Sequence, residues 1–111
     1  MDKQDRKAAI AAYKDRKVEG GVFAVRCSAT GEAWVGKAAD LDKIRNRVWF
    51  SLGHGSHMSR SLQAAWNAHG ADAFSFEALE AIDPDEPSYV RDTLFREALA
   101  RWQERLGATL L

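Results

Sequence analysis

Apolar residues in the first third of the chain pass from a helical spacing to a strand spacing. Residues 2–17 are rich in Ala, Lys, Arg and Gln, which favour a helix. The apolar runs at 22–27 and 33–35 are too short for helices and predict two strands. Thr30 and Gly31 lie between the runs and are typical turn residues, so the two strands are expected to form one hairpin.

Two further helices are predicted in the middle of the chain, each with its own start signal. Asp40 is a plausible N-cap for a helix over 41–52, where apolar residues recur at three- and four-residue intervals. Ser59 is the same kind of signal for a helix over 60–69, and Gly70 is a typical stop. Both segments therefore have an apolar face that packs on a core.

The last part of the chain alternates as a strand and then returns to helical spacing. Residues 74–79 alternate apolar and polar side chains and predict a third strand, and a final helix is expected to begin near Ser88. This order predicts an α+β fold, a small three-stranded antiparallel sheet flanked by helices, with an extra N-terminal helix. The expected division is a helix over residues 1–19 and a domain over residues 20–111.

Composition narrows the class of protein. Hydrophobic residues make up 46% and charged residues 29% of the chain, which is typical of a globular domain rather than a disordered one. No apolar run reaches the roughly 18–20 residues that span a bilayer. The first residues lack the apolar core of a secretory signal, so we expect a cytoplasmic protein that does not enter a membrane. Cys27 is the single cysteine, which excludes an internal disulfide.

Charge is unevenly distributed although the net charge is zero. Residues 37–69 carry five Lys and Arg residues, two Asp residues and all three histidines, whereas residues 71–111 carry nine acidic residues and four arginines. A local positive face on a neutral protein can contact phosphate groups, although ordinary solvated surfaces have the same charge asymmetry. The candidate nucleic-acid-binding residues are Lys37, Lys43, Arg45, Arg47, His57 and Arg60.

Two tripeptides on the predicted hairpin, Gly21-Val22-Phe23 and Trp34-Val35-Gly36, carry a family resemblance. They resemble the paired signature of the GIY-YIG nuclease family, with both signature tyrosines replaced. The order of later features, namely residues 62–66, then Gly70, then the pair Phe76 and Glu77, is also similar to short members of that family. The resemblance extends over roughly residues 21–106 and implies the α+β nuclease fold.

The resemblance implies a metal-dependent endonuclease that acts on nucleic acid. The family uses two tyrosines near an attacking water, an arginine on the next helix, and a glutamate that holds a divalent cation. The matching positions here are Phe23 and Trp34 for the tyrosines and Glu97 for the glutamate, with Mg²⁺ or Mn²⁺ as the implied cofactor. The usual arginine position is Ile44, and Arg47 is the cation nearest to it in direction around a helix.

These replacements change the chemistry that the signature can perform. Phe23 keeps the ring and lacks the hydroxyl, and the indole N–H of Trp34 donates a hydrogen bond but cannot accept a proton. A general base contributes roughly 10²–10⁴ to a rate, so its loss matters. The hypotheses are therefore an atypical metal-dependent endonuclease, a catalytically inactive nucleic-acid-binding module, and a protein-interaction domain.

Overall fold

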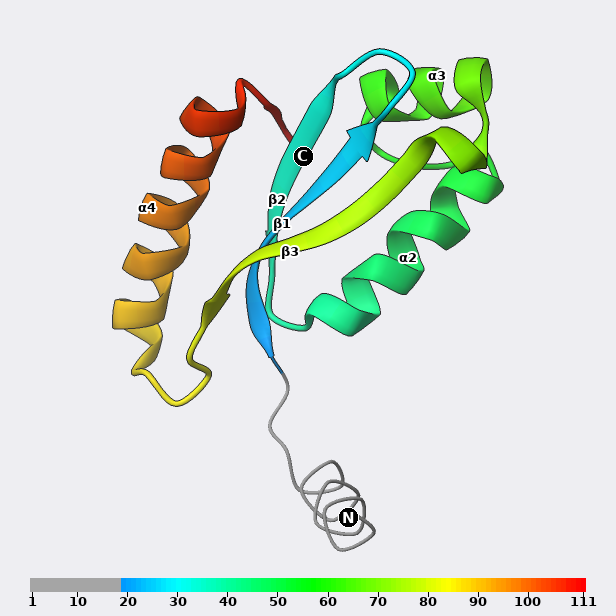
Figure 1. The fold of residues 1–111 in the computed structure, drawn as a ribbon. Coiled ribbons are helices and arrows are strands. Elements are labelled where there is room, and N and C mark those ends of the chain that lie inside the picture. Colours follow the sequence, from blue (N-terminus) through cyan, green and yellow to red (C-terminus); the bar gives the residue numbers. More distant parts are fainter. Residues whose placement is uncertain (1–18) are drawn as a thin grey trace, which may run out of the picture.

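The structure is a computed structural model that describes residues 19–111. The helix expected over residues 1–19 therefore lies almost entirely outside the described residues. In chain order the elements are β1 (Gly20–Cys27), β2 (Ala33–Ala38), α2 (Leu41–Gly53), α3 (Arg60–His69), the short 3-10 turn η1 (Ala71–Ala73), β3 (Phe74–Ile82), α4 (Ser88–Leu106) and β4 (Thr109–Leu110) (Figure 1). All three predicted strands are present, and each extends beyond the predicted bounds.

The strands form one sheet in the order β3-β1-β2-β4, and helices cover both of its faces (Figure 1). The central strand β1 pairs antiparallel with β2 and with β3. The predicted fold class is confirmed, but the predicted number of strands is wrong, because β4 adds a fourth strand parallel to β2. Two residues are too few to show the alternation by which a strand is recognised, so β4 has no signal in the sequence.

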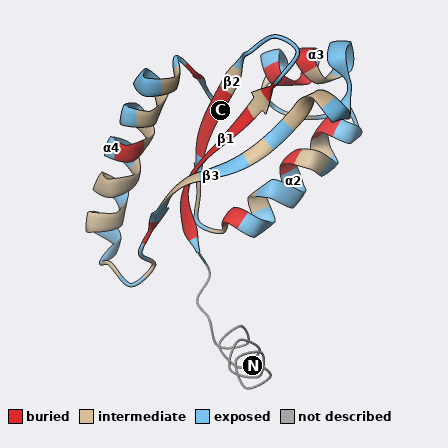
Figure 2. Cartoon of the chain, in the orientation of Figure 1, coloured by how far each residue is buried: buried red, intermediate tan, exposed pale blue. Residues whose placement is uncertain are grey.

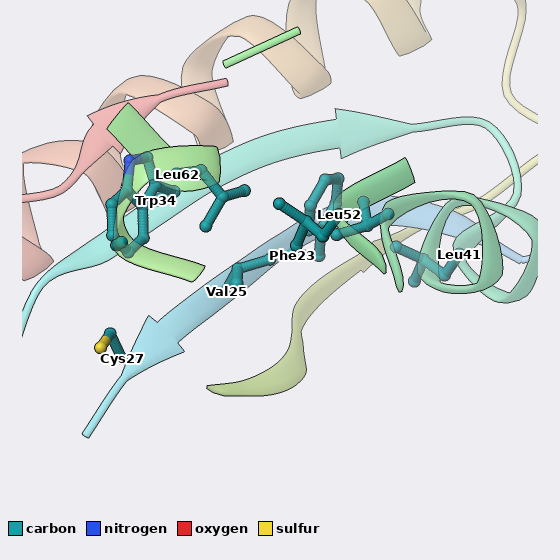
Figure 3. Close-up of a cluster of buried hydrophobic side chains, with 9 residues drawn as sticks. Phe23, Val25, Cys27, Trp34, Leu41, Leu52 and Leu62 are labelled. Atoms are coloured by element: carbon teal, nitrogen blue, oxygen red, sulfur yellow. The ribbon is translucent and has the colours of Figure 1, made fainter. Parts of the chain in front are cut away.

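Alternation along β1 divides the core between the two faces. Phe23, Val25 and Cys27 pack with α2 and α3, and Figure 3 shows these three side chains along one side of the strand. Val22 and Ala24 point to the opposite face, where they belong to the clusters that α4 and the residues after it cover. Figure 2 shows β1 buried along nearly its whole length. This burial on both faces follows from its place inside the sheet.

The predicted helix caps of α2 and α3 are present. The carboxylate of Asp40 accepts a hydrogen bond from the backbone N–H of Lys43 at 3.0 Å. The hydroxyl of Ser59 accepts one from the N–H of Leu62 at 3.4 Å. Gly70 ends α3 with a φ of 85°, a conformation that strongly favours glycine. These caps fix where α2 and α3 begin, and Gly70 fixes where α3 ends.

The glycine of each tripeptide lies where the sheet leaves no room for a side chain. A β-carbon on Gly21 would meet the carbonyl oxygen of Glu80 on the neighbouring strand β3. A β-carbon on Gly36 would lie 2.8 Å from Cζ of Phe23, which faces it across the hairpin. The two glycines therefore have a structural role in the close packing around β1.

The described helices do not resemble membrane spans. None of them combines the length and the apolar character needed to cross a bilayer.

Candidate functional site

A cavity of about 670 Å³, here called the main cavity, opens between the hairpin, α2 and the loop that joins α2 to α3. The apolar part of its lining, here called the floor, lies around Gly36 and the end of the chain beside β2. The backbone N–H of Leu111 donates to the carbonyl of Val35 at 2.8 Å, which holds that end in place. The apolar side chains of the floor are Phe23, Ile44, Val48, Leu99, Leu110 and Leu111.

Apart from Met58, the remaining side chains that line the main cavity are polar. They are Lys37, Arg47, Ser51, Ser56, His57 and Ser59. Lys37 and Arg47 are both exposed, and within residues 19–111 neither has an ion-pair partner. We call these two residues the basic rim. No Asp or Glu side chain among the described residues lines the main cavity, so the side chains of its lining carry a net positive charge.

The two candidate arginines of α2, Arg45 and Arg47, lie on different flanks of the helix. Arg47 lines the main cavity beside Ile44, as its direction around the helix predicts. Arg45 lies about 200° further around the helix and does not line the cavity. Its guanidinium is 3.9 Å from the carboxylate of Asp42 instead. Arg47 is thus the α2 arginine that can contact a ligand in the cavity.

His57 lies on the loop that forms one wall of the main cavity. Its Nδ1 accepts a hydrogen bond from the backbone N–H of Ser59 at 2.9 Å, and its own backbone N–H donates to Oε1 of Gln63 at 3.0 Å. Because Nδ1 is an acceptor, the ring proton of the neutral imidazole is on Nε2. Burial lowers the pKa of His57, which favours this neutral form. His57 therefore offers a hydrogen-bond donor rather than a fixed charge.

Trp34 is buried in the core and does not line the main cavity. Its indole N–H donates to the hydroxyl of Ser61 on α3 at 2.9 Å, and its ring packs against Phe74. Phe23 is also buried, and its ring stacks on Phe76 with the centroids 5.0 Å apart. Figure 3 shows Trp34 and Phe23 at separate places in the same apolar cluster. Of the two signature positions, only Phe23 contributes to the cavity.

Glu97, the expected metal ligand, is exposed on α4 and does not line the main cavity. Leu99, two residues later, does line it, so the Glu97 side chain leaves the helix about 200° away from that direction. Arg101, its possible partner one turn later, forms an ion pair with Glu80 at 2.8 Å. Among residues 19–111, no three His, Cys, Asp or Glu side chains form a group that could hold a metal ion.

A smaller cavity of about 300 Å³ lies beside the main cavity along α4 and shares Lys37, Leu99 and Leu110 with it. Arg96 and Asp92 line it, and neither was a candidate site residue from the sequence. The two residues lie on the flank of α4 that faces β2 and β4. The apolar face of this helix is too wide for the sequence to show which flank would face the hairpin. Arg96 adds a second cation near Lys37, and the carboxylate of Asp92 lies in the same lining.

The remaining candidate residues lie outside the main cavity. Lys43 is exposed on α2, and its position lies about 40° around the helix from Arg47. Arg60 is exposed at the start of α3. The structure therefore brings together Phe23, Lys37, Arg47 and His57, whereas the other candidates, namely Trp34, Lys43, Arg45, Arg60 and Glu97, are not part of this lining.

Comparison with known proteins agrees with the arrangement of strands and helices. A mutant of the catalytic domain of the intron endonuclease I-TevI matches with a TM-score of 0.68 and 29% sequence identity, over 81% of this chain and 86% of that one. The catalytic domain of the homing endonuclease I-TevI matches with a TM-score of 0.68 and 26% identity, over 83% of this chain and 97% of that one. No protein-family model and no curated protein matches the chain. The chain therefore has the fold of a GIY-YIG nuclease domain.

Proposed function

We propose that the protein binds nucleic acid at the main cavity through its basic rim. The observation that carries the proposal is the pair of exposed cations, Lys37 and Arg47, in the lining of a cavity to which no described Asp or Glu side chain contributes. Phosphate contacts dominate the affinity of proteins for nucleic acids. A guanidinium can form two parallel hydrogen bonds with one phosphate group, and an ammonium acts as a point charge. The likeness to endonuclease catalytic domains supports the same class of ligand.

Metal-dependent cleavage is the second candidate function, and it rests on that likeness. Mg²⁺ and Mn²⁺ prefer oxygen ligands, and Mg²⁺ sites usually contain one or two carboxylates. Glu97 is the carboxylate that the resemblance assigns to the ion, yet it lies on a different flank of α4 from the cavity-lining Leu99. The side chains of the main cavity supply hydroxyls and one imidazole but no carboxylate. These residues do not fit a Mg²⁺ or Mn²⁺ site, so we assign no step of a reaction to a metal.

Salt dependence tests the proposed binding. The Kd of the full chain for a labelled DNA duplex and for a labelled single strand should increase with salt, with log Kd rising linearly with log salt concentration. Arg47→Ala should weaken binding and reduce the slope by about one. Arg45→Ala is the matched control, because Arg45 lies on the same helix and outside the cavity. Equal effects of the two substitutions would contradict binding at the main cavity. Affinity that is independent of salt would contradict nucleic-acid binding itself and favour a protein-interaction domain.

A nuclease assay separates binding from cleavage. The protein is incubated with single- and double-stranded DNA and RNA in Mg²⁺, in Mn²⁺ and in EDTA. Cleavage that requires the metal and is lost in Glu97→Ala would establish the endonuclease and would show that the side chains rearrange around the substrate. Intact binding without product in any condition is the result that the present arrangement of residues favours.

A further inference from the structure

The floor of the main cavity has a composition that phosphate contacts do not explain. Contacts to a nucleic-acid backbone need cations and hydrogen-bond donors, and Lys37 and Arg47 of the basic rim supply both. The floor is instead apolar, with Phe23, Ile44 and Leu110 among its side chains. A volume of about 670 Å³ with a mainly apolar lining and a few polar groups is typical of a site for a small organic group. A nucleobase, with its two apolar faces and polar edges, is such a group.

Met58, which also lines the main cavity, is 95% exposed. Its two neighbours are held by hydrogen bonds: the N–H of His57 donates to Gln63, and the N–H of Ser59 donates to the ring of His57. Gln63 is buried, and its amide also donates to the carbonyl of Leu52 at 3.1 Å. A fixed loop therefore presents an apolar side chain to solvent beside a positive cavity. Proteins that distort a duplex insert apolar side chains such as Met between bases.

We propose that the main cavity receives a nucleobase that has left its stack, and that Met58 occupies the position which the base vacates. The proposal rests on the proposed binding of nucleic acid and adds the form of the ligand, a duplex with an unpaired nucleotide. The basic rim contacts the flanking phosphates, and the apolar floor covers the faces of the base. Unpairing a base costs a few kcal/mol and costs least at a bulge or a mismatch, so such sites are the preferred ligands.

The experiment compares a paired duplex with the same duplex that carries a bulged 2-aminopurine nucleotide. We expect the full chain to bind the bulged duplex about tenfold more tightly, because covering one base contributes roughly 1–3 kcal/mol. Bound protein should also protect the 2-aminopurine from quenching by acrylamide. In Ser56→Phe the new ring fills part of the cavity, so protection should be lost while salt-dependent binding to the paired duplex remains.

Met58→Ser tests the role of the exposed side chain with little risk to folding. It should abolish most of the tenfold preference and keep the affinity for the paired duplex. Tyr89→Ser is the matched control, because Tyr89 is 74% exposed on α4 and does not line the cavity. Equal affinity for the two duplexes without protection, together with normal salt dependence, would overturn this inference and leave the proposed function standing. Absence of salt-dependent binding to either duplex would overturn both.

Discussion

Cζ of Phe23 lies 2.8 Å from the place that a β-carbon on Gly36 would occupy. The two residues face each other in the register of the hairpin, and the Phe23 ring stacks on Phe76 on its other neighbour strand. Phe23 and Gly36 also line the main cavity. Phe23, which stands at a signature tyrosine position, and the signature glycine Gly36 therefore pack together as one unit of the sheet.

Gly36→Ala should destabilise the protein because the new methyl group meets this ring. Overpacking of a tight core typically costs about 1–3 kcal/mol, so we expect a lower urea midpoint with an unchanged slope. Gly53→Ala is the control: nothing lies within 4 Å of its added carbon, and Ala favours the helix that Gly53 ends. A Gly36→Ala protein as stable as the Gly53→Ala protein would show that the Phe23 ring moves away without strain.

Trp34→Phe should lower stability while leaving nucleic-acid binding unchanged. The substitution removes the indole N–H that donates to Ser61 and leaves a void in the buried cluster, for a cost of about 2 kcal/mol. Because Trp34 does not line the main cavity, the salt-dependent affinity should be retained. Ser61→Ala breaks the same hydrogen bond, so the two substitutions should be less than additive in urea unfolding. Weaker binding by folded Trp34→Phe protein would contradict this placement.

Local signals predicted the elements because each acts within a few residues. The caps at Asp40 and Ser59 involve backbone groups only three residues away. The placement of Arg47 on the cavity also follows from helical geometry, since the apolar positions of α2 already define its buried face. The fourth strand had no such signal. It depends on a hydrogen bond between residues far apart in sequence, Leu111 and Val35.

The candidate site was harder to predict than the fold, for two physical reasons. An aromatic residue on a strand suits a core and a binding surface equally well, and Trp34 proves to be core. The wide apolar face of α4 did not define which flank of that helix faces the hairpin. Arg96 therefore lines a cavity although it was not a candidate, and the lining of neither cavity includes Glu97.

The stability of the folded chain should fall on mild acidification because of His57. Burial lowers the pKa of its imidazole below the ordinary 6.5, so between these two values the unfolded chain binds more protons than the folded one. The stability that this group contributes is complete above pH 6.5 and is lost as the pH falls through the lowered pKa. Urea unfolding should show this decrease, and His57→Gln should remove it. An NMR titration with a His57 pKa above 6.5 would contradict the expected sign.

Glu80 joins β3 to α4 and should stabilise their packing. Its carboxylate accepts hydrogen bonds from the indole of Trp102 and the guanidinium of Arg101, each at 2.8 Å. Both donors lower the pKa of Glu80, and the Trp102 hydrogen bond has the larger effect. Glu80→Ala should cost about 1 kcal/mol in urea unfolding, whereas Glu77→Ala, which breaks an exposed ion pair with Arg26, should cost a few tenths. The Glu80 contribution is complete above the ordinary carboxyl pKa of 4.5 and is lost as the pH falls through the lowered value. The stability difference between wild type and Glu80→Ala should therefore shrink in acid, and a difference that grows there would show that the carboxylate is not the stabilising form.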